Sequence, residues 1–276
     1  MKNRKRLIIW SVVGVFFAVI IGLTIWGNTS VGLNTYTITD SEIPKEFDGY
    51  RIALVSDLHN SWLWEKALEK VEKAEPDIVV ITGDIMSRDD TDVDLALNFV
   101  LELMKLTRGY CFYVSGNHES DLPEEIYAQL IQGMKEMGVT VMEDAATMLY
   151  NGTLNGIALV GVENNNEKHA AEILEEELPG FDGYKILLAH NPGYFDDYAA
   201  AGYELVLSGH THGGQIRLPF IGAVYSPDQG FFPDYDSGVV TEGDSTIVIS
   251  RGIGNSRIPI RFLCRPEVVV IELQRG

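Results

Sequence analysis

The stretch Asp77-Ile-Val-Val-Ile-Thr-Gly-Asp84 decides the fold class of this chain. Residues 78–81 form a continuous β-branched apolar run, which is typical of a short strand buried on both faces of a sheet. Thr82 and Gly83 end the run, so Asp84 follows at the carboxyl end of the strand. In open α/β sheets, that end faces the crevice in which ligands bind. The stretch therefore predicts a central strand with a carboxylate at the ligand-binding edge.

The same arrangement of an apolar strand followed by polar residues recurs along the chain. Strand and helix alternate in the first half, and strands dominate the second half. This order predicts an α/β fold in which two sheets lie face to face with helices outside. Strands are predicted at 51–56, 78–82, 110–115, 184–189, 204–208, 246–250 and 268–273, and helices at 62–74, 92–106 and 123–137.

The charge of the chain excludes one class of partner. The 276 residues include 21 basic and 40 acidic side chains, a formal net charge of −19. Four basic residues precede residue 7 and no acid occurs before Asp40, so the rest of the chain carries 17 − 40 = −23. Such a charge repels nucleic-acid backbones, and we expect no specific nucleic-acid partner.

The N-terminal region predicts a membrane anchor. Residues 7–26 contain no charged side chain, and as a helix they span about 30 Å, the thickness of the hydrocarbon core of a bilayer. A cleaved signal peptide is the alternative, but its apolar core is shorter and is followed by a small-x-small site. The basic residues before the run predict a cytoplasmic N-terminus and an extracytoplasmic catalytic domain. The expected organisation is a cytoplasmic basic segment (1–6), a transmembrane signal anchor (7–26), a linker (27–44) and one domain (45–276).

The two cysteines, Cys111 and Cys264, lie in apolar, strand-like surroundings. An exported protein could join them in a disulfide. Two buried small hydrophobic side chains are the interpretation that we favour.

Polar residues with the chemistry of metal ligands gather at the predicted strand ends. Five of the six histidines follow strands, and only His169 lies in a predicted charged helix. A single histidine after a strand is usually a satisfied turn residue, but a whole set at adjacent strand ends indicates a metal site. The set is Asp57, His59, Asp84, Asn117, His118, His190, His210 and His212.

Histidine, aspartate and asparagine without cysteine favour divalent transition metals, here Mn, Fe or Zn. The ligands outnumber what one tetrahedral ion needs. Two ions about 3.5–4 Å apart, with one bridging carboxylate, would use them. Asp84 is the expected bridge because its strand is central.

These residues resemble the ordered motif set of the calcineurin-like metallophosphoesterases. The blocks are Asp57-x-His59, Gly83-Asp84, Gly116-Asn117-His118-Glu119, His190 and Gly209-His210-x-His212. The segments Gly213-Gly214-Gln215, Ser250-Arg251-Gly252-Ile253-Gly254 and Pro259-Ile260-Arg261 resemble the bacterial membrane-associated, YkuE/YaeI-type branch of that family.

The resemblance implies an αββα sandwich, two mixed sheets flanked by helices, with a dinuclear site. It implies that Asp57, His59, Asp84 and His212 bind the first ion, and that Asp84, Asn117, His190 and His210 bind the second. It also implies that His118 stays off the metals and faces the leaving group. We expect nearby carboxylates to favour its charged form, and Glu119 to orient it.

The expected activity is hydrolysis of phosphodiester, and possibly phosphomonoester, bonds by a metal-bridging hydroxide, with the enzyme anchored at the membrane. His118 and Asp84 are the expected catalytic residues. One alternative is a pyrophosphatase or phosphatase of a lipid-linked envelope substrate, like UDP-diacylglucosamine hydrolases. A metal-binding adaptor without catalysis is the other alternative, and the complete ligand set speaks against it.

An arginine-rich segment follows the predicted strand at 246–250. It contains Arg251, Arg257, Arg261 and Arg265 among glycines and prolines, in a chain that is otherwise acidic. Arginine forks match phosphate oxygens, so Arg251, with Asn255 beside it, is the candidate substrate-binding position. Pairing with surface carboxylates is the competing explanation.

Overall fold

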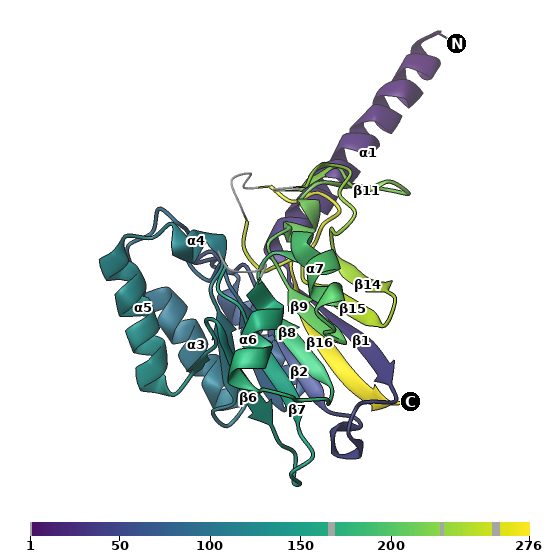
Figure 1. Ribbon diagram of the computed structural model, residues 1–276. Coiled ribbons are helices and arrows are strands. Elements are labelled where there is room, and N and C mark those ends of the chain that lie inside the picture. The colour runs from purple at the N-terminus through teal and green to yellow at the C-terminus, as the bar shows by residue number, and fades with distance from the viewer. Residues whose placement is uncertain (1, 165–168, 227–228, 256–259) are drawn as a thin grey trace.

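A computed structural model describes residues 2–164, 169–226, 229–255 and 260–276 (Figure 1). Arg257, one of the four arginines noted above, lies outside these ranges. The described residues form two six-stranded sheets, two short hairpins and helices on both outer faces.

The first sheet has the strand order β1-β16-β2-β3-β4-β5. β1 and β16 are parallel to each other, β16 is antiparallel to β2, and β2 to β5 are parallel. Its strands are β1 (Gly32–Asp40), β2 (Arg51–Val55), β3 (Ile78–Thr82), β4 (Cys111–Val114), β5 (Thr140–Val141) and β16 (Glu267–Arg275).

The second sheet has the order β14-β15-β9-β8-β7-β6, with four parallel central strands and an antiparallel strand at each edge. Both sheets are therefore mixed. The strands are β6 (Ala145–Leu149), β7 (Ile157–Gly161), β8 (Lys185–Leu188), β9 (Leu205–Ser208), β14 (Gly238–Glu242) and β15 (Ser245–Ile249).

Helices cover the outer face of each sheet, as Figure 1 shows. One apolar cluster joins the first sheet to its helices, a second lies between the sheets, and a third joins the second sheet to its helices. The predicted αββα sandwich is confirmed. The helices on the first sheet are α2 (Trp64–Ala74), α3 (Asp94–Leu106) and α5 (Glu124–Met137), and those on the second are α6 (Ala170–Glu177) and α7 (Phe195–Ala200).

β3 shows why the opening stretch is continuously apolar. All five residues of the strand are buried. Val79 and Ile81 face the helices, and Ile78 and Val80 face the second sheet. Burial of each such side chain stabilises the fold by about 1.5–3 kcal/mol, so both faces of the strand select apolar residues.

The predicted linker at 27–44 is wrong for residues 32–40, which form β1 instead. Thr35, Thr37 and Thr39 are exposed, whereas Ile38 is buried between the sheets. β1 is an edge strand whose outer face is polar, and this composition resembles that of a spacer. The helix before it, α1 (Lys2–Thr29), leaves only Ser30 and Val31 as a connection.

α1 projects from one end of the domain (Figure 1). Within residues 3–29, an 18-residue window has a mean hydropathy of 2.6, so this helix is long and apolar enough to cross a bilayer. Cys111 and Cys264 are free and buried, as expected.

Candidate metal centre

The sandwich brings the predicted ligands to one edge. Asp57 and His59 follow β2, Asp84 follows β3, and Asn117 and His118 open a short helix, α4 (Asn117–Ser120), after β4. His190 follows β8, and His210 and His212 follow β9. The carboxyl ends of five parallel strands from two facing sheets therefore supply the site. All of these side chains are buried except that of Asn117, which is half-buried.

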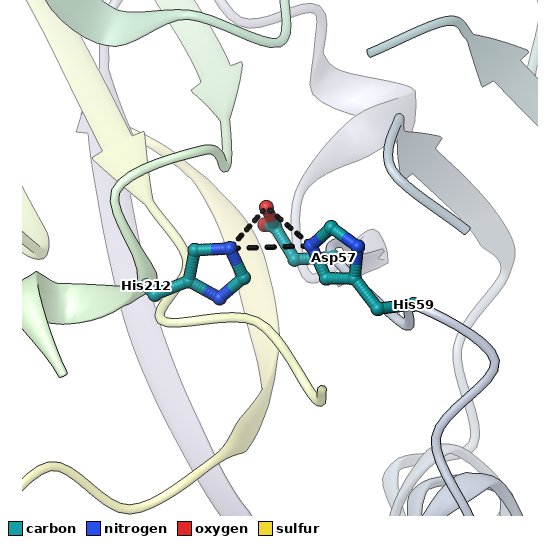
Figure 2. Close-up of side chains that lie close together, drawn as sticks. All are labelled: Asp57, His59 and His212. Atoms are coloured by element: carbon teal, nitrogen blue, oxygen red, sulfur yellow. Dashed lines mark hydrogen bonds and ion pairs between the residues drawn. The ribbon is translucent and has the colours of Figure 1, made fainter. Parts of the chain in front are cut away.

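Asp57, His59 and His212 form the first half of the site (Figure 2). Nε2 of His59 and Nε2 of His212 are 3.2 Å apart, and Oδ1 of Asp57 lies 3.5 Å from Nε2 of His212 and 4.0 Å from Nε2 of His59. Figure 2 shows both rings directing a nitrogen toward the same carboxylate. Three donor atoms that converge in this way fit one divalent cation.

Asp84, His190 and His210 form the second half. Nε2 of His190 lies 3.1 Å from Nδ1 of His210 and 3.2 Å from Oδ1 of Asn117. Nδ1 of His190 lies 2.7 Å from the carbonyl oxygen of Thr82, so Nδ1–H donates to it and Nε2 is left for a metal.

Asp84 lies between the two halves. Its Oδ2 atom is 3.6 Å from Nε2 of His59 and 3.4 Å from Nε2 of His190. Oδ1 of the same carboxylate accepts a hydrogen bond of 2.8 Å from the backbone N–H of His118, which fixes the carboxylate plane. This placement fits the bridging position that the sequence predicted.

The backbone is strained at the same positions. Asp57, His59, Asp84, His210 and His212 have φ between 48° and 69°, a region that non-glycine residues rarely adopt. Such strain persists where the surroundings enforce it, and it is concentrated at functional sites.

The positions packed directly against Asp57 and Asp84 have room only for glycine. A Cβ atom on Gly209 would collide with the Oγ atom of Ser56 and the carboxylate of Asp57, and one on Gly116 would collide with the carboxylate of Asp84. The glycines of the Gly-Asn-His and Gly-His-x-His blocks therefore leave room for the carboxylates of Asp84 and Asp57.

The protonation states suit metal binding. Burial lowers the pKa of His59 to about 3 and holds that of His212 well below its usual range, so both rings are neutral. Burial also opposes charge on His190, but the negative charge of Asp84 and its hydrogen bond raise the pKa of His190 to about 10. A divalent cation at this position would replace the proton on Nε2.

His118 lies beside the ligands with a defined tautomer. The backbone N–H of Arg88 donates to its Nδ1 atom at 3.1 Å, so a neutral His118 carries its proton on Nε2, 4.0 Å from Oδ2 of Asp84. Burial lowers its pKa despite the opposing charge of Asp84. Asp84 and Asp121 thus favour the charged form of His118, as expected, but burial outweighs them. His118 also forms a third possible ligand group with His59 and Asp84.

The expectation that Glu119 orients His118 is wrong, because its carboxylate binds backbone groups instead. The Glu119 carboxylate accepts the backbone N–H groups of Asp84 at 2.6 Å, Met86 at 3.0 Å and Gly116 at 2.8 Å. It thus joins the loops after β3 and β4 behind the ligands. Burial and the charge of Asp84 raise the pKa of Glu119 to about 7, against these hydrogen bonds.

We expect Glu119→Gln to destabilise the fold and weaken metal binding. The amide NH₂ of glutamine would face backbone donors, and each buried donor left without an acceptor costs about 1–3 kcal/mol. Thermal unfolding with and without Mn²⁺ measures both effects. Glu125→Gln, at an exposed position of α5, is the matched control. An unchanged Tm for Glu119→Gln would contradict this role.

Arg261 lies against the site, although the sequence pointed to it only through the arginine-rich segment and the Pro259-Ile260-Arg261 block. Its guanidinium is fully buried and donates to the carbonyl oxygens of His212 at 3.3 Å and Arg251 at 2.8 Å. It also lies 3.3 Å from Nδ1 of His212 and donates to Oδ1 of Asn255 at 3.0 Å. Arg261 thus holds the His212 ring from behind.

The two candidate substrate-binding residues lie near this arginine. The backbone N–H of Arg251 donates to the buried carboxylate of Glu267, and its guanidinium lies 3.7 Å from the same carboxylate. Arg251 thus has a carboxylate partner, but Glu267 is buried, whereas the competing explanation expected a surface carboxylate. A substrate contact by Arg251 or Asn255 stays a prediction.

The fold and the clustered ligands define a metal-dependent phosphoesterase of the sandwich type, and comparison with known proteins agrees. The chain belongs to the calcineurin-like phosphoesterase family, whose model matches residues 50–214. It is a hydrolase of phosphoric esters.

The similar curated proteins come from the expected branch. "Uncharacterized metallophosphoesterase YkuE" of Bacillus subtilis is 32% identical over 253 residues, covering 87% of this chain and 84% of the relative. "Phosphodiesterase YaeI" of Escherichia coli is 29% identical over 238 residues, covering 81% and 82%. "Uncharacterized metallophosphoesterase YkoQ" of Bacillus subtilis is 29% identical over 244 residues, covering 86% and 88%.

Proposed function

We propose that this protein is a membrane-anchored phosphodiesterase with two divalent transition-metal ions. The observation that carries the proposal is the shared position of Asp84 Oδ2, within 3.6 Å of a ligand nitrogen from each half of the site. Asp57, His59, Asp84 and His212 would hold one ion, and Asp84, Asn117, His190 and His210 the other. The sequence similarity to YaeI, which is named a phosphodiesterase, supports phosphodiesters over phosphomonoesters as substrates.

Bound divalent ions supply Lewis acidity and a hydroxide nucleophile near neutral pH. The protein supplies the geometry. Neutral His59 and His212 offer lone pairs, and Thr82 fixes the His190 ring through its carbonyl oxygen. Nε2–H of His118 would donate to the phosphoryl or leaving-group oxygen, and the Arg88 amide bound to Nδ1 supports this tautomer.

An assay with bis-p-nitrophenyl phosphate and the metal-reconstituted full chain tests the activity. We expect hydrolysis with Mn²⁺ that is lost with a chelator and restored by metal. p-Nitrophenyl phosphate is the monoester comparison. A metal-loaded protein that hydrolyses neither ester would favour the adaptor alternative.

We also propose that α1 spans the membrane with the N-terminus in the cytoplasm. Residues 7–26 are uncharged, and the basic residues precede them. The C-terminus lies at the end of the domain away from α1 (Figure 1), so a reporter fused after Gly276 should not disturb the anchor.

Alkaline phosphatase fused at that position is expected to be active, and a green fluorescent protein fusion dark, because the first works only when exported. The fusion should also stay in the membrane fraction. The reverse pattern would invert the orientation, and a mature N-terminus near residue 30 would show cleavage.

A further inference from the structure

The metal centre and the end of α1 lie at the same edge of the first sheet. β1 starts directly after α1, runs parallel to β16, and is therefore antiparallel to β2. The amino end of β1 thus lies beside the carboxyl end of β2, where Asp57 is placed. The helix consequently leaves the domain from the side on which the metal ligands gather (Figure 1).

Specific contacts hold α1 to this edge. The Asn28 side chain donates to the carbonyl oxygen of Arg261 at 2.8 Å and accepts from the backbone N–H of Arg261 at 2.9 Å. The guanidinium of Arg265 stacks on the Trp26 ring, 4.9 Å from its centroid. Because Arg261 also holds His212, a single residue joins the end of α1 to the metal centre.

Two short hairpins beside this junction present exposed apolar side chains. They are β10 (Arg217–Leu218) with β11 (Gly222–Ala223), and β12 (Tyr225–Ser226) with β13 (Gly230–Phe231). Phe220 is fully exposed, and Phe231, Phe232 and Ile221 are each more than half exposed. We call the side chains of Leu218, Phe220, Ile221, Phe231 and Phe232 the hairpin surface.

Backbone hydrogen bonds connect the hairpin surface to the α1 junction. The N–H of Arg217 donates to the carbonyl oxygen of Phe262, the residue after Arg261, and the N–H of Phe232 donates to that of Val224, between the hairpins. Figure 1 shows β11 beside the part of α1 nearest the domain. The hairpin surface is thus connected through Phe262 and Arg261 to the point where the helix leaves the protein.

Another aromatic residue lies on the α2 side of the same junction. Trp62 is 61% exposed, and the Lys66 ammonium lies 5.1 Å from the centroid of its ring. The same ammonium donates to the carbonyl oxygen of Thr29 at the end of α1. Aromatic rings with a lysine and an arginine beside them, at the end of a helix proposed to span the bilayer, match the chemistry of a headgroup interface.

We propose that the hairpin surface enters the interfacial region of the lipid bilayer beside α1, which turns the metal-binding edge toward the membrane. This inference rests on the proposed membrane span of α1. Large exposed apolar groups mark interaction surfaces, and here the bilayer is already brought to them by the adjoining helix. A phosphodiester carried in a lipid headgroup would then meet the metal centre at the bilayer surface.

Leu154 provides a matched control position. It is 92% exposed, and it lies in the connection between β6 and β7. β7 is parallel to β8, whose carboxyl end carries His190, so this connection lies at the opposite end of the sandwich from the metal centre. An equally exposed apolar residue there should not touch the bilayer.

The test uses the full chain in phosphatidylcholine vesicles that contain chain-brominated phosphatidylcholine. Phe220→Cys and Leu154→Cys are labelled with a bimane fluorophore. The buried Cys111 and Cys264 should not react, and the unmodified chain checks this. We expect quenching by brominated lipid to be several-fold greater at position 220 than at 154. Equal quenching at the two positions would overturn the proposal. The proposal would also be overturned if brominated lipid did not quench the label at position 220 and that position were covered by a second copy of the chain instead.

A kinetic arm uses the double variant Phe220→Ser, Ile221→Ser. We expect unchanged turnover of soluble bis-p-nitrophenyl phosphate, unchanged metal content and a several-fold lower turnover of a phosphodiester lipid analogue in vesicles. Equal loss on both substrates would assign the residues to the fold of the site instead. Failure of the hairpin proposal can be told apart from failure of the proposed phosphodiesterase activity. Quenching by lipid needs no activity, and hydrolysis of the soluble diester needs no bilayer.

Discussion

Replacing Asp84 by asparagine is expected to reduce phosphodiester hydrolysis by several orders of magnitude and to lower the metal content. The Asp84 carboxylate is the group that approaches ligand nitrogens of both halves, and asparagine removes the negative charge that two cations would share. Burial opposes ionisation of Asp84, but the positive charge of His190 and its hydrogen bond hold the pKa of Asp84 well below its usual range. The carboxylate is therefore ionised over the working range of pH.

The measurement is elemental analysis of the purified variant together with its turnover. Asp182→Asn, at an exposed position before β8, is the matched control and should keep full activity and metal. If the Asp84→Asn protein held two ions and had near-normal turnover, the assignment of Asp84 as the bridging ligand would be wrong.

The second large effect is expected for His118→Ala, which should slow hydrolysis by about 10²–10⁴ while both ions stay bound, the usual contribution of a positioned proton donor. The loss should shrink for esters with good leaving groups, because these need less help from Nε2–H. The structure also places His118 in a possible ligand group with His59 and Asp84, so the metal content decides between the two roles.

His169→Ala is the control for this variant, because His169 is exposed and pairs with Glu172 on the surface. Loss of an ion from His118→Ala would make His118 a ligand. An equal loss of rate for esters with good and poor leaving groups would instead contradict the role of His118 as proton donor to the leaving group.

The sequence was sufficient to predict that the candidate ligand side chains gather at one edge, because a simple rule places them. Each follows an apolar run, and parallel strands end at a common edge. The pairing of Asp84 with both halves followed from the central position of β3 between β2 and β4. These inferences needed only the order of strands and the types of residue after them.

The sequence was not sufficient where tertiary contacts decide. Glu119 follows His118 in α4, and consecutive side chains on a helix point in different directions, so adjacency gave the wrong partner. Arg261 and His212 are far apart in sequence, and only the fold brings them together. A signal for β1 was present in the alternation of Thr35, Tyr36, Thr37 and Ile38, but its polar outer face concealed it.

The two-residue connection between α1 and β1 has a consequence for the range of the enzyme. A long flexible tether would let a catalytic domain sample a wide shell above the membrane. Here the strand begins at Gly32, directly after a helix that ends at Thr29 and is fastened to Arg261. In the proposed orientation, the domain is a rigid extension of its anchor with a fixed height and tilt. Its substrates must come to the lipid surface, and esters deeper in the cell envelope would lie beyond its reach.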